Sequence, residues 1–490
     1  MGKEHKVFEN LSPQIQLIRG GVEDETFITN PQGNLVNRIL SEGRMRPTND
    51  VLVEAIKDLV KKQGNGFYEP LIEDNGDGFR YQLEVDGSMV EMTSSGLAVV
   101  RKELGENILG VEEAIDQTIL ERFILYQVAQ EVSNDELVLY PYSAPAFIDQ
   151  DYDIALPEGK PKDVQEYYQK MLNEYGIKLV FAGRHLHFAV PDSLIETLYQ
   201  PNTSHEKVEI DLCRLGRTFV DEMIALSNAS PIYGGKLGLI QSQRNYVNGF
   251  PKPQNIDVGG WYESPEKFNA MKEQMIRNGD IFRWPNHLYI LVRPKGGGRI
   301  ELRALDLVTD RDLQEATALY YQLKLTHLLI RHKSENGFNY AYDDDAVRIF
   351  RRNERQAAKL GAFAQVDKSA LGGNKKITIQ EQVRLSLDNE VRPLAEVLGV
   401  ADKLKPLEPF IYRGENEALR IIERFKRGSI YNPNYYPEFV KEEILSYQKL
   451  LIEQVRGALA RINDNSSDVS KKLKRFVLEV FGEKLERIQR

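Results

Sequence analysis

The sequence predicts an α+β fold in which an antiparallel sheet forms the floor of a site and helices flank the sheet. Four short segments have the pattern of strands and carry charged or metal-ligating side chains two residues apart; these pairs are Glu23 and Glu25, Glu91 and Thr93, His185 and His187, and Glu301 and Arg303. The helices between the strands lack the regular βαβ alternation of a parallel sheet. Both observations favour antiparallel pairing.

The spacing of two residues has a direct consequence for the sheet. Successive side chains on a strand point to opposite faces, so both members of each pair share one face. If the four strands lie in one sheet, that face is acidic and also carries an imidazole and a guanidinium. Such a face suits several divalent cations and a nucleotide polyphosphate. The alternative is the solvated face of an ordinary antiparallel sheet, where alternation is also expected.

In the first part of the chain, turn-forming residues separate the predicted elements. Asn30-Pro31-Gln32-Gly33 ends the first strand, and Asp86-Gly87 suits the tight turn of a hairpin. Apolar spacing of three and four residues marks the helices. We expect strands over 14–30 and 79–95, helices over 50–62, 111–132 and 164–175, and a long loop over 140–162.

The same signals continue from residue 176 to residue 400. Thr203-x-x-Glu206 forms a plausible capping box at a helix start, and the Asp343-Asp344-Asp345 run precedes a helix that it would cap. Pro393 is expected to kink its helix. We expect strands over 176–191, 288–292 and 299–305, helices from 203 and over 310–332, 345–360 and 378–398, and an active-site loop over 230–262.

The last ninety residues have a mostly helical pattern. We therefore divide the chain into a catalytic domain over 1–400 and a helical C-terminal extension over 401–490. An apolar stripe on the last helix predicts that it packs onto the body of the protein or onto a second subunit, which leaves a homo-oligomer open.

Composition limits the class of protein. The 490 residues are 41% hydrophobic and 28% charged, as in ordinary globular proteins, and the formal charge of -9 argues against a nucleic-acid partner. The one cysteine, Cys213, allows no internal disulfide and is expected to be a buried small residue. No apolar stretch reaches membrane-spanning length, so neither a membrane partner nor a membrane segment is expected, and the cytoplasm is the expected location.

Two glycine-rich segments fail the tests for phosphate-binding loops. Gly234-Gly235-Lys236 lacks the upstream glycine and the following Ser or Thr of a P-loop, and Gly296-Gly297-Gly298 fits a hairpin tip. A bound nucleotide would therefore be held largely by metal ions. We expect Mg²⁺ at this face, with Glu23, Glu25, Glu91 and Glu301 as oxygen ligands and His187 as a nitrogen ligand or an orienting group.

Two arginines are the expected catalytic groups. Arg303 can hold phosphate oxygens with its planar fork, although a structural salt bridge to a glutamate is the alternative. Arg244 is the second candidate, and a solvated arginine is the alternative. Glu91, Arg303 and Arg244 are also expected to bind the nucleotide. His185 is expected to pack beside the ligands or to bond a carboxylate.

In this order the segments resemble the type 2 glutamate–cysteine ligase family, carboxylate–amine ligases related in fold to glutamine synthetase. The resemblance covers about residues 20 to 400 and rests on GVEDETFITNPQG, VEMTS, HLHFAVPD, IALSNASPIYGGKLGLIQSQRNYV and LVRPKGGGRIELRALD. The sequence departs from the family pattern at Asn228-Ala229-Ser230-Pro231, where an alanine is inserted. The C-terminal extension is also longer than the family tail.

The resemblance implies a glutamine synthetase-like fold and an ATP-dependent ligase that forms a γ-glutamyl amide through an acyl phosphate. Its small-molecule substrates would be glutamate, ATP, and cysteine or another amine. Two alternatives stay open: a γ-glutamyl ligase for another amine or a guanidino-type phosphotransferase on the same scaffold, and a non-catalytic regulatory or binding protein. Replacing Glu301 or Arg303 by alanine is expected to lower turnover strongly without unfolding the protein.

Overall fold

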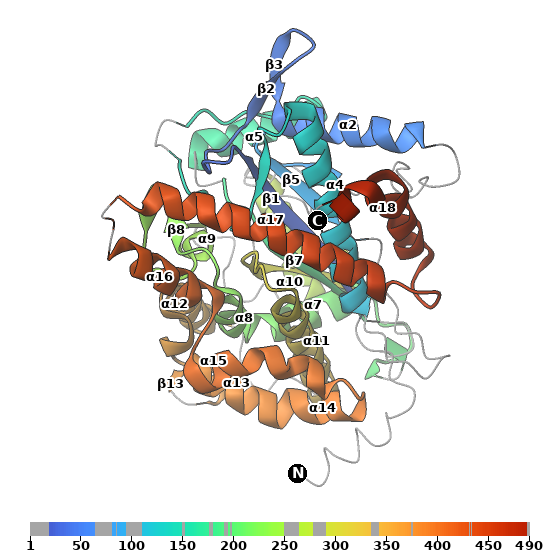
Figure 1. Ribbon diagram of the computed structural model, residues 1–490. Coiled ribbons are helices and arrows are strands. Elements are labelled where there is room, and N and C mark those ends of the chain that lie inside the picture. Colours follow the sequence, from blue (N-terminus) through green and yellow to red (C-terminus); the bar gives the residue numbers. More distant parts are fainter. Residues whose placement is uncertain are drawn as a thin grey trace.

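The central feature of the fold is a seven-stranded antiparallel sheet (Figure 1). The structure is a computed structural model, which describes residues 19–63, 81–84, 86–94, 110–148, 152–175, 180–190, 195–196, 198–248, 264–277, 291–334, 343–373, 376–430, 432 and 434–487. The strands of the sheet are β1 (Arg19–Thr29), β4 (Tyr81–Leu83), β5 (Met89–Thr93), β6 (Val138–Tyr140), β7 (Arg184–Ala189), β10 (Val292–Gly296) and β11 (Arg299–Leu305).

The order of the strands is β10-β11-β7-β1-β5-β4, and β6 pairs with the end of β1. Every pairing in this sheet is antiparallel. The predicted α+β fold with an antiparallel sheet is therefore confirmed. The four strands that carry the charged pairs, β11, β7, β1 and β5, are consecutive neighbours.

Helices make up most of the remaining structure. They are α2 (Thr48–Lys62), α4 (Gly110–Ser133), α5 (Lys162–Tyr175), α7 (His205–Arg217), α8 (Val220–Ser227), α9 (Gln243–Asn248), α10 (Pro265–Arg277), α11 (Arg311–Ser334), α12 (Asp344–Leu360), α13 (Ile379–Ser386), α14 (Arg392–Val397), α15 (Glu408–Arg413), α16 (Glu417–Ser429), α17 (Tyr436–Arg461) and α18 (Asp468–Arg487). Short 3₁₀ segments are η2 (Gly361–Phe363), η3 (Ser369–Leu371) and η5 (Ala401–Leu407). The described residues also form three two-stranded pairs: β2 (Arg38–Ser41) with β3 (Arg44–Pro47), β8 (Ile232–Tyr233) with β9 (Lys236–Leu237), and β12 (Gln365–Val366) with β13 (Ile377–Thr378).

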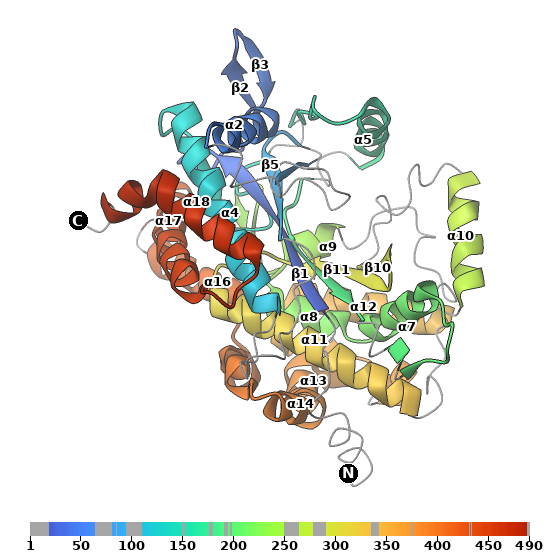
Figure 2. The same ribbon diagram turned by 90° about the vertical axis from the view of Figure 1, so that its right-hand side faces the viewer.

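In β1, β5, β7 and β11 the even-numbered residues face the main apolar core. Val22, Leu186 and Leu302 lie there with Phe123 of α4 and Tyr321 of α11, all fully or almost fully buried. Figure 2 shows α4 beside β1, with α8 and α11 below the sheet. Because the helices cover this face, the odd-numbered residues point the other way, which leaves the charged pairs together on the second face.

Two local predictions need correction. The N-cap of α7 is Ser204, whose side chain accepts a hydrogen bond from Lys207 N, so the capping residue lies one position after Thr203. The helix predicted over 378–398 is interrupted by a π-helical turn, η4 (Leu387–Val391), directly before α14. A π turn adds a residue to the helical turn, and it lies just before Pro393, whose missing N–H would break the regular ladder.

Other local predictions are confirmed. Asp343 caps α12 by accepting from Ala346 N at 2.8 Å. Cys213 is fully buried, and burial raises the pKa of its thiol well above the usual range. The described part of the loop predicted over 140–162 holds only the last residue of β6 and the first residue of α5, whereas the described part of the loop predicted over 230–262 contains β8, β9 and α9, so the second prediction is wrong there. Positions 14–18, 249–262 and 288–290 lie outside the described residues.

The C-terminal helices pack on the body of the protein. Val477 and Phe481 of α18 are buried against α4, so the apolar stripe covers the body, and α17 crosses the same region (Figure 1). Phe439 of α17 shares a second core with Phe27 of β1. In the part of the chain that the structure describes, no helix combines the length and the apolar character needed to cross a bilayer.

Glu417, in the first turn of α16, ties the C-terminal helices to the body. Its carboxylate accepts hydrogen bonds from Thr309 N at 2.9 Å and Thr309 Oγ1 at 2.6 Å. Burial raises the pKa of Glu417 to about 7, and the charge of Asp310 adds to the shift. Glu417 therefore binds a proton more tightly in the folded protein than in the unfolded chain.

We predict that Glu417 lowers the stability of the protein as the pH rises. Its folded pKa of about 7 lies above the ordinary 4.5, so its contribution is full below pH 4.5 and is lost as the pH rises to 7. The free energy of unfolding of the wild type relative to Glu417→Gln should fall by roughly 2 kcal/mol between pH 5 and pH 8 in urea titrations. The exposed Glu453→Gln is the matched control, and equal pH profiles for the wild type and Glu417→Gln would contradict the assignment.

Candidate active site

The register of the sheet places the predicted site residues in adjoining rows. Glu25 lies opposite Glu91, Glu23 opposite His185, and Glu301 opposite His187. Because the residues of each pair are separated by two positions, all of these side chains lie on the face away from the main core. The expectation that the four strands share one sheet and one face is confirmed.

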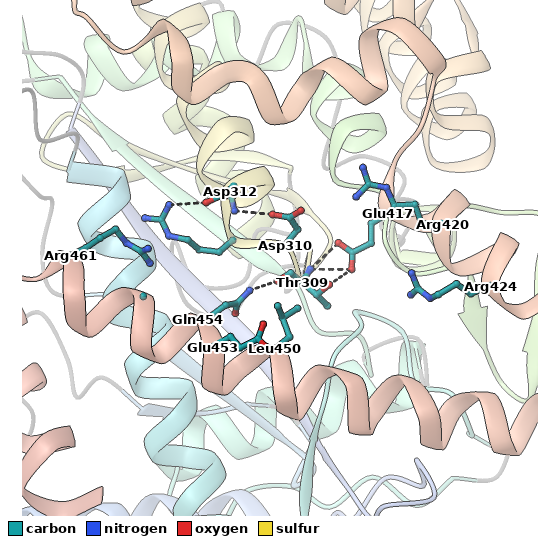
Figure 3. Close-up of a pocket in the computed structure, with 12 residues that line it drawn as sticks. Thr309, Asp310, Asp312, Glu417, Arg420, Arg424, Leu450, Glu453, Gln454 and Arg461 are labelled. Carbon is teal, nitrogen blue, oxygen red and sulfur yellow. Dashed lines mark hydrogen bonds and ion pairs between the residues drawn. The ribbon is translucent and has the colours of Figure 1, made fainter. Parts of the chain in front are cut away.

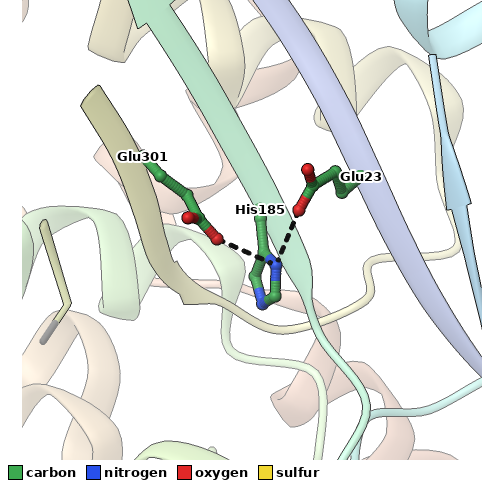
Figure 4. Close-up of side chains that lie close together, drawn as sticks. All are labelled: Glu23, His185 and Glu301. Atoms are coloured by element: carbon green, nitrogen blue, oxygen red, sulfur yellow. Dashed lines mark hydrogen bonds and ion pairs between the residues drawn. The ribbon is translucent and has the colours of Figure 1, made fainter. Parts of the chain in front are cut away.

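Two overlapping groups on this face have the donor atoms of a metal site. One is Glu23, His185 and Glu301, and the other is Glu25, Glu91 and His185; within each group the ligand atoms lie within 4.8 Å of one another. Figure 4 shows the first group, in which β1, β7 and β11 each supply one side chain and the carboxylates converge on the imidazole. Carboxylate oxygens are the ligands that Mg²⁺ prefers.

His185, and not His187, stands at the centre of both groups. His185 Nδ1 lies 3.3 Å from Glu23 Oε2 and 3.3 Å from Glu301 Oε1, and its Nε2 lies 3.6 Å from Glu25 Oε1. Burial lowers the pKa of His185 to about 3, with the charge of Arg303 as the next cause. A neutral imidazole offers one unprotonated nitrogen, so His185 can serve one group at a time.

His187 occupies the edge of the same cluster. Its Nε2 lies 2.8 Å from Glu23 Oε1, and it belongs to neither of the two groups. Burial opposes ionisation of Glu23, but the charge of His187 and the hydrogen bonds of both histidines outweigh burial and hold the pKa of Glu23 well below its usual range. Glu23 is thus a carboxylate at neutral pH. His187 as a direct ligand stays a prediction.

Glu301 is fully buried and is compensated by three cations. Its Oε2 lies 2.6 Å from Arg293 Nε and 2.8 Å from Lys295 Nζ, and its Oε1 lies 3.6 Å from Arg303 Nε. Burial opposes its ionisation, but the charges of Arg293, Arg303 and Lys295 hold the pKa of Glu301 well below the usual range. Sequence reasoning missed Arg293 and Lys295, although their position on the strand that pairs with 299–305 was a usable signal.

Glu25 and Glu91 lack this compensation. Burial raises the pKa of Glu25 to about 8, and the neighbouring Glu84 adds to the shift. Burial also raises the pKa of Glu91 well above the usual range, with the charge of Glu23 as the next cause. Among the residues that the structure describes, Glu91 has no hydrogen-bond or ion-pair partner. This half of the face has more negative charge than it can hold without an added cation.

The two predicted arginines approach the face from different elements. Arg303 lies at an irregularity in β11, where the register with β7 shifts between Leu302 and Leu305, so that Arg303 points back toward Glu301. Arg244, on α9, is buried against Gly183, where a Cβ would lie 2.3 Å from Arg244 Nη2. Its charge lowers the pKa of Glu25, which places Arg244 next to the uncompensated half of the face.

Asp306, at the end of β11, fixes the segment that carries Arg244. It accepts hydrogen bonds from Ala229 N at 3.0 Å, Ser230 Oγ at 2.7 Å and Ser242 Oγ at 2.9 Å. Asn245, next to Arg244, donates to Ala304 O at 2.9 Å. The serines of this segment are thus bound to the strand that carries Glu301 and Arg303, which sequence reasoning did not anticipate.

The inserted alanine of the Asn-Ala-Ser-Pro segment fits this arrangement. Ala229 supplies the backbone N–H that Asp306 accepts, and Asn228 donates to Ala357 O at 2.9 Å. Asn228 is fully buried and binds the backbone of α12. Its contacts are those of a residue that fixes the loop.

The opposite face of the sheet anchors the acidic strand. Asp24 is fully buried and accepts from Arg184 Nε at 2.6 Å and from Arg122 Nη2 at 2.6 Å. Arg122 also donates to Tyr447 of α17 at 3.0 Å. Asp24 therefore joins β1 to β7, α4 and α17 from behind, which keeps Glu23 and Glu25 in register above it.

Comparison with known proteins gives the family. The model of glutamate–cysteine ligase family 2 matches residues 155–442, more than half of the chain. Among curated relatives, a Bordetella avium protein named "Putative glutamate--cysteine ligase 2" is 26% identical over 268 residues, which cover 54% of this chain and 59% of that protein. A Laribacter hongkongensis protein of the same name is 24% identical over 55% of this chain and 64% of its own length. The matched region thus spans less than two thirds of either relative.

Solved structures confirm the fold. A glutamate–cysteine ligase from Francisella tularensis, in complex with AMP, aligns with a TM-score of 0.62 at 14% identity and covers 96% of this chain and 99% of that chain. A bifunctional glutathione synthetase from Pasteurella multocida also gives a TM-score of 0.62 at 14% identity, over 94% of this chain and 56% of that chain. At these identities the likeness shows the glutamine synthetase-like fold. The family model matches residues 155–442, and the chain therefore belongs to glutamate–cysteine ligase family 2.

Proposed function

We propose that this chain is an ATP-dependent ligase that joins the γ-carboxylate of glutamate to an amine, with cysteine as the leading acceptor. The observation that carries the proposal is the convergence of buried carboxylates, an imidazole and two arginines on one face of the sheet, in a chain of this family. The names of the relatives, and the AMP bound to the Francisella tularensis enzyme, support ATP as the co-substrate.

The residues on the acidic face fit Mg²⁺. Glu91 is a buried carboxylate without a partner among the described residues, and burial raises the pKa of both Glu25 and Glu91, so a cation would relieve an existing cost. We assign Glu25 and Glu91 to one ion and Glu23 and Glu301 to another, with His185 serving one of them. Bound there, Mg²⁺ would neutralise charge on the triphosphate of ATP.

The side chains around this face would divide the remaining tasks. In the first step the γ-phosphoryl group moves from ATP to the γ-carboxylate of glutamate, giving an acyl phosphate and ADP. The amine then attacks the acyl carbon, loses a proton, and inorganic phosphate leaves. Arg303 and Arg244 would offset the charge of the transferred group because guanidinium groups bind phosphate oxygens with two parallel hydrogen bonds.

The two glycine-rich segments do not have the geometry of a phosphate-binding loop. Gly234 and Gly235 lie at the tip of the β8–β9 hairpin with positive φ, and Gly297 and Gly298 have positive φ at the β10–β11 tip. Both segments make tight turns between strands, and neither precedes a helix as a phosphate-binding loop does. The nucleotide would therefore depend on the carboxylates, their ions and the arginines.

The direct test is ADP release with glutamate and each of twenty candidate amines, with and without Mg²⁺. We expect release that requires both Mg²⁺ and an amine, with cysteine giving the highest rate. Faster ADP release with another amine would identify a γ-glutamyl ligase with a different acceptor. Phosphate transfer to a guanidino compound, or no turnover together with no rise in melting temperature on adding Mg·ATP, would favour the two alternative classes.

Replacing Arg303 by alanine should lower turnover by about 10²–10³-fold, because Arg303 would stabilise charge in the transferred group. Its melting temperature should stay close to that of the wild type, since the Arg303 side chain is 18% exposed and Glu301 keeps two other cations. The exposed Arg348→Ala, on α12, is the matched control and should keep full activity. Normal turnover in Arg303→Ala would refute its role.

The structure changes the expectation for Glu301→Ala. Removing this buried carboxylate would break its 2.6 Å ion pair with Arg293, which is itself buried. Breaking a buried ion pair in this way costs about 3–5 kcal/mol. Turnover lost in Glu301→Ala could therefore come either from the missing catalytic group or from unfolding. Arg303→Ala is the more informative variant.

Mg²⁺ binding should strengthen as the pH rises. The pKa of Glu25 is about 8, so at pH 6.5 this side chain holds a proton that a metal ion would have to displace, and at pH 8.5 it does not. We expect the dissociation constant for Mg²⁺, measured calorimetrically without nucleotide, to fall roughly tenfold over this range. Glu25→Gln should flatten the dependence. Equal affinity of the wild type at both pH values would sink the assignment of Glu25.

A further inference from the structure

A polar pocket lies between the loop that precedes α11 and helices α16 and α17. It has a volume of about 480 Å³. Figure 3 shows the side chains of α16 and α17 directed toward the Thr309–Asp312 loop. The residues that line it are Thr309, Asp310, Arg311, Asp312, Glu417, Arg420, Arg424, Leu450, Glu453, Gln454, Gly457 and Arg461.

Three of the four arginines in the pocket are already paired. Arg461 donates to both oxygens of Asp116, at 2.8 and 2.7 Å. Arg311 lies 3.1 Å from the same carboxylate and also contacts Glu315. Arg424 donates to both oxygens of Glu443, at 2.9 and 2.6 Å. These guanidinium groups shape the wall of the pocket and have few hydrogen bonds left to give.

Arg420 is different. It is half-buried, and within the described part of the chain its guanidinium has no hydrogen-bond or ion-pair partner. Gln454 faces the same space, donates from Nε2 to Thr309 O at 2.6 Å, and has a buried Oε1 that accepts no hydrogen bond from a described residue. The pocket therefore offers one unused cation, whereas Gln454 Oε1 is enclosed beneath the pocket surface and is closed to a ligand.

The other charged side chains of the pocket limit which kind of molecule could bind to Arg420. Glu417 and Asp310 carry carboxylates at the pocket wall, and Glu453 adds an exposed one. A dianion such as phosphate would meet three carboxylates for one unused guanidinium, and a simple cation would meet four arginines. A molecule with a carboxylate at one end and an ammonium group at the other satisfies both sides, because the carboxylate can bind Arg420 and the ammonium group can donate to Glu453 and Glu417.

We propose that this pocket binds a small zwitterion, a free α-amino acid or a short peptide, through Arg420 and the carboxyl groups of Glu417 and Glu453. The volume falls in the range of small-molecule sites. The site is separate from the acidic face of the sheet, and it does not depend on the proposed function.

Binding is tested on the full chain, without nucleotide or Mg²⁺, by thermal shift and calorimetry. The probes are the twenty L-amino acids and glycylglycine, and the best binder is then compared with its amide and its N-acetyl derivative. We expect at least one zwitterion to bind, and both derivatives to bind about tenfold or more weakly, because each removes one charge. Stronger binding by glycylglycine than by any free amino acid would identify a peptide site.

Variants separate the pocket from the acidic face. Arg420→Ala should lower affinity for the best binder by about tenfold or more without changing the melting temperature of the free protein, since Arg420 has no partner among the described residues. Arg427→Ala, exposed on the same helix, and Arg303→Ala, at the sheet, should both bind as the wild type does. Equal binding by Arg420→Ala, no binding by any probe, or tighter binding of inorganic phosphate would overturn the proposal. Turnover is not measured, so failure of the ligase proposal would leave this test unaffected.

Discussion

The structure depends on how one buried face of a sheet holds several carboxylates. Antiparallel pairing of β11, β7, β1 and β5 brings Glu23, Glu25, Glu91 and Glu301 together, and burial opposes the ionisation of each. Each negative charge must then meet a nearby cation or keep a proton. Some carboxylates on the face have nearby cations and others are held protonated, and this difference divides the site into two parts.

Glu301 stays ionised because Arg293, Lys295 and Arg303 surround it, whereas the high pKa values of Glu25 and Glu91 show that their half of the face is short of positive charge. A protein gains nothing in stability from such an uncompensated pair. The arrangement is the one expected of a site that takes up cations with its substrate. Electrostatics thus supports cation binding at this face, which the proposed ligase chemistry requires.

The supports of this face come from distant parts of the chain. Asp24 anchors β1 from behind through Arg122 and Arg184, and Asp306 binds the Arg244 segment to β11. The C-terminal helices share in both cores, and the family match continues to residue 442, past the boundary predicted at 400. Division into a catalytic domain over 1–400 and an extension over 401–490 stays a prediction.

The sequence by itself determined which residues share a face, because a spacing of two on a strand fixes the side of a sheet whatever the partner strand is. It also determined the turn at Gly296-Gly297-Gly298, where all three glycines have positive φ. The tight turn predicted at Asp86-Gly87 is wrong, because Leu83 pairs with Val90, which leaves a longer connection, and Gly87 does not have positive φ. Only the tertiary structure decided that His185 lies between the carboxylates and His187 at the edge, since both share a face and the register between β1, β7 and β11 selects one of them. The same holds for Arg293, Lys295 and Asp306, whose partners lie across strands or loops, and for the pocket around Arg420, whose walls come from segments over a hundred residues apart. Pairing across such distances depends on the packing of the whole chain, which no local pattern encodes.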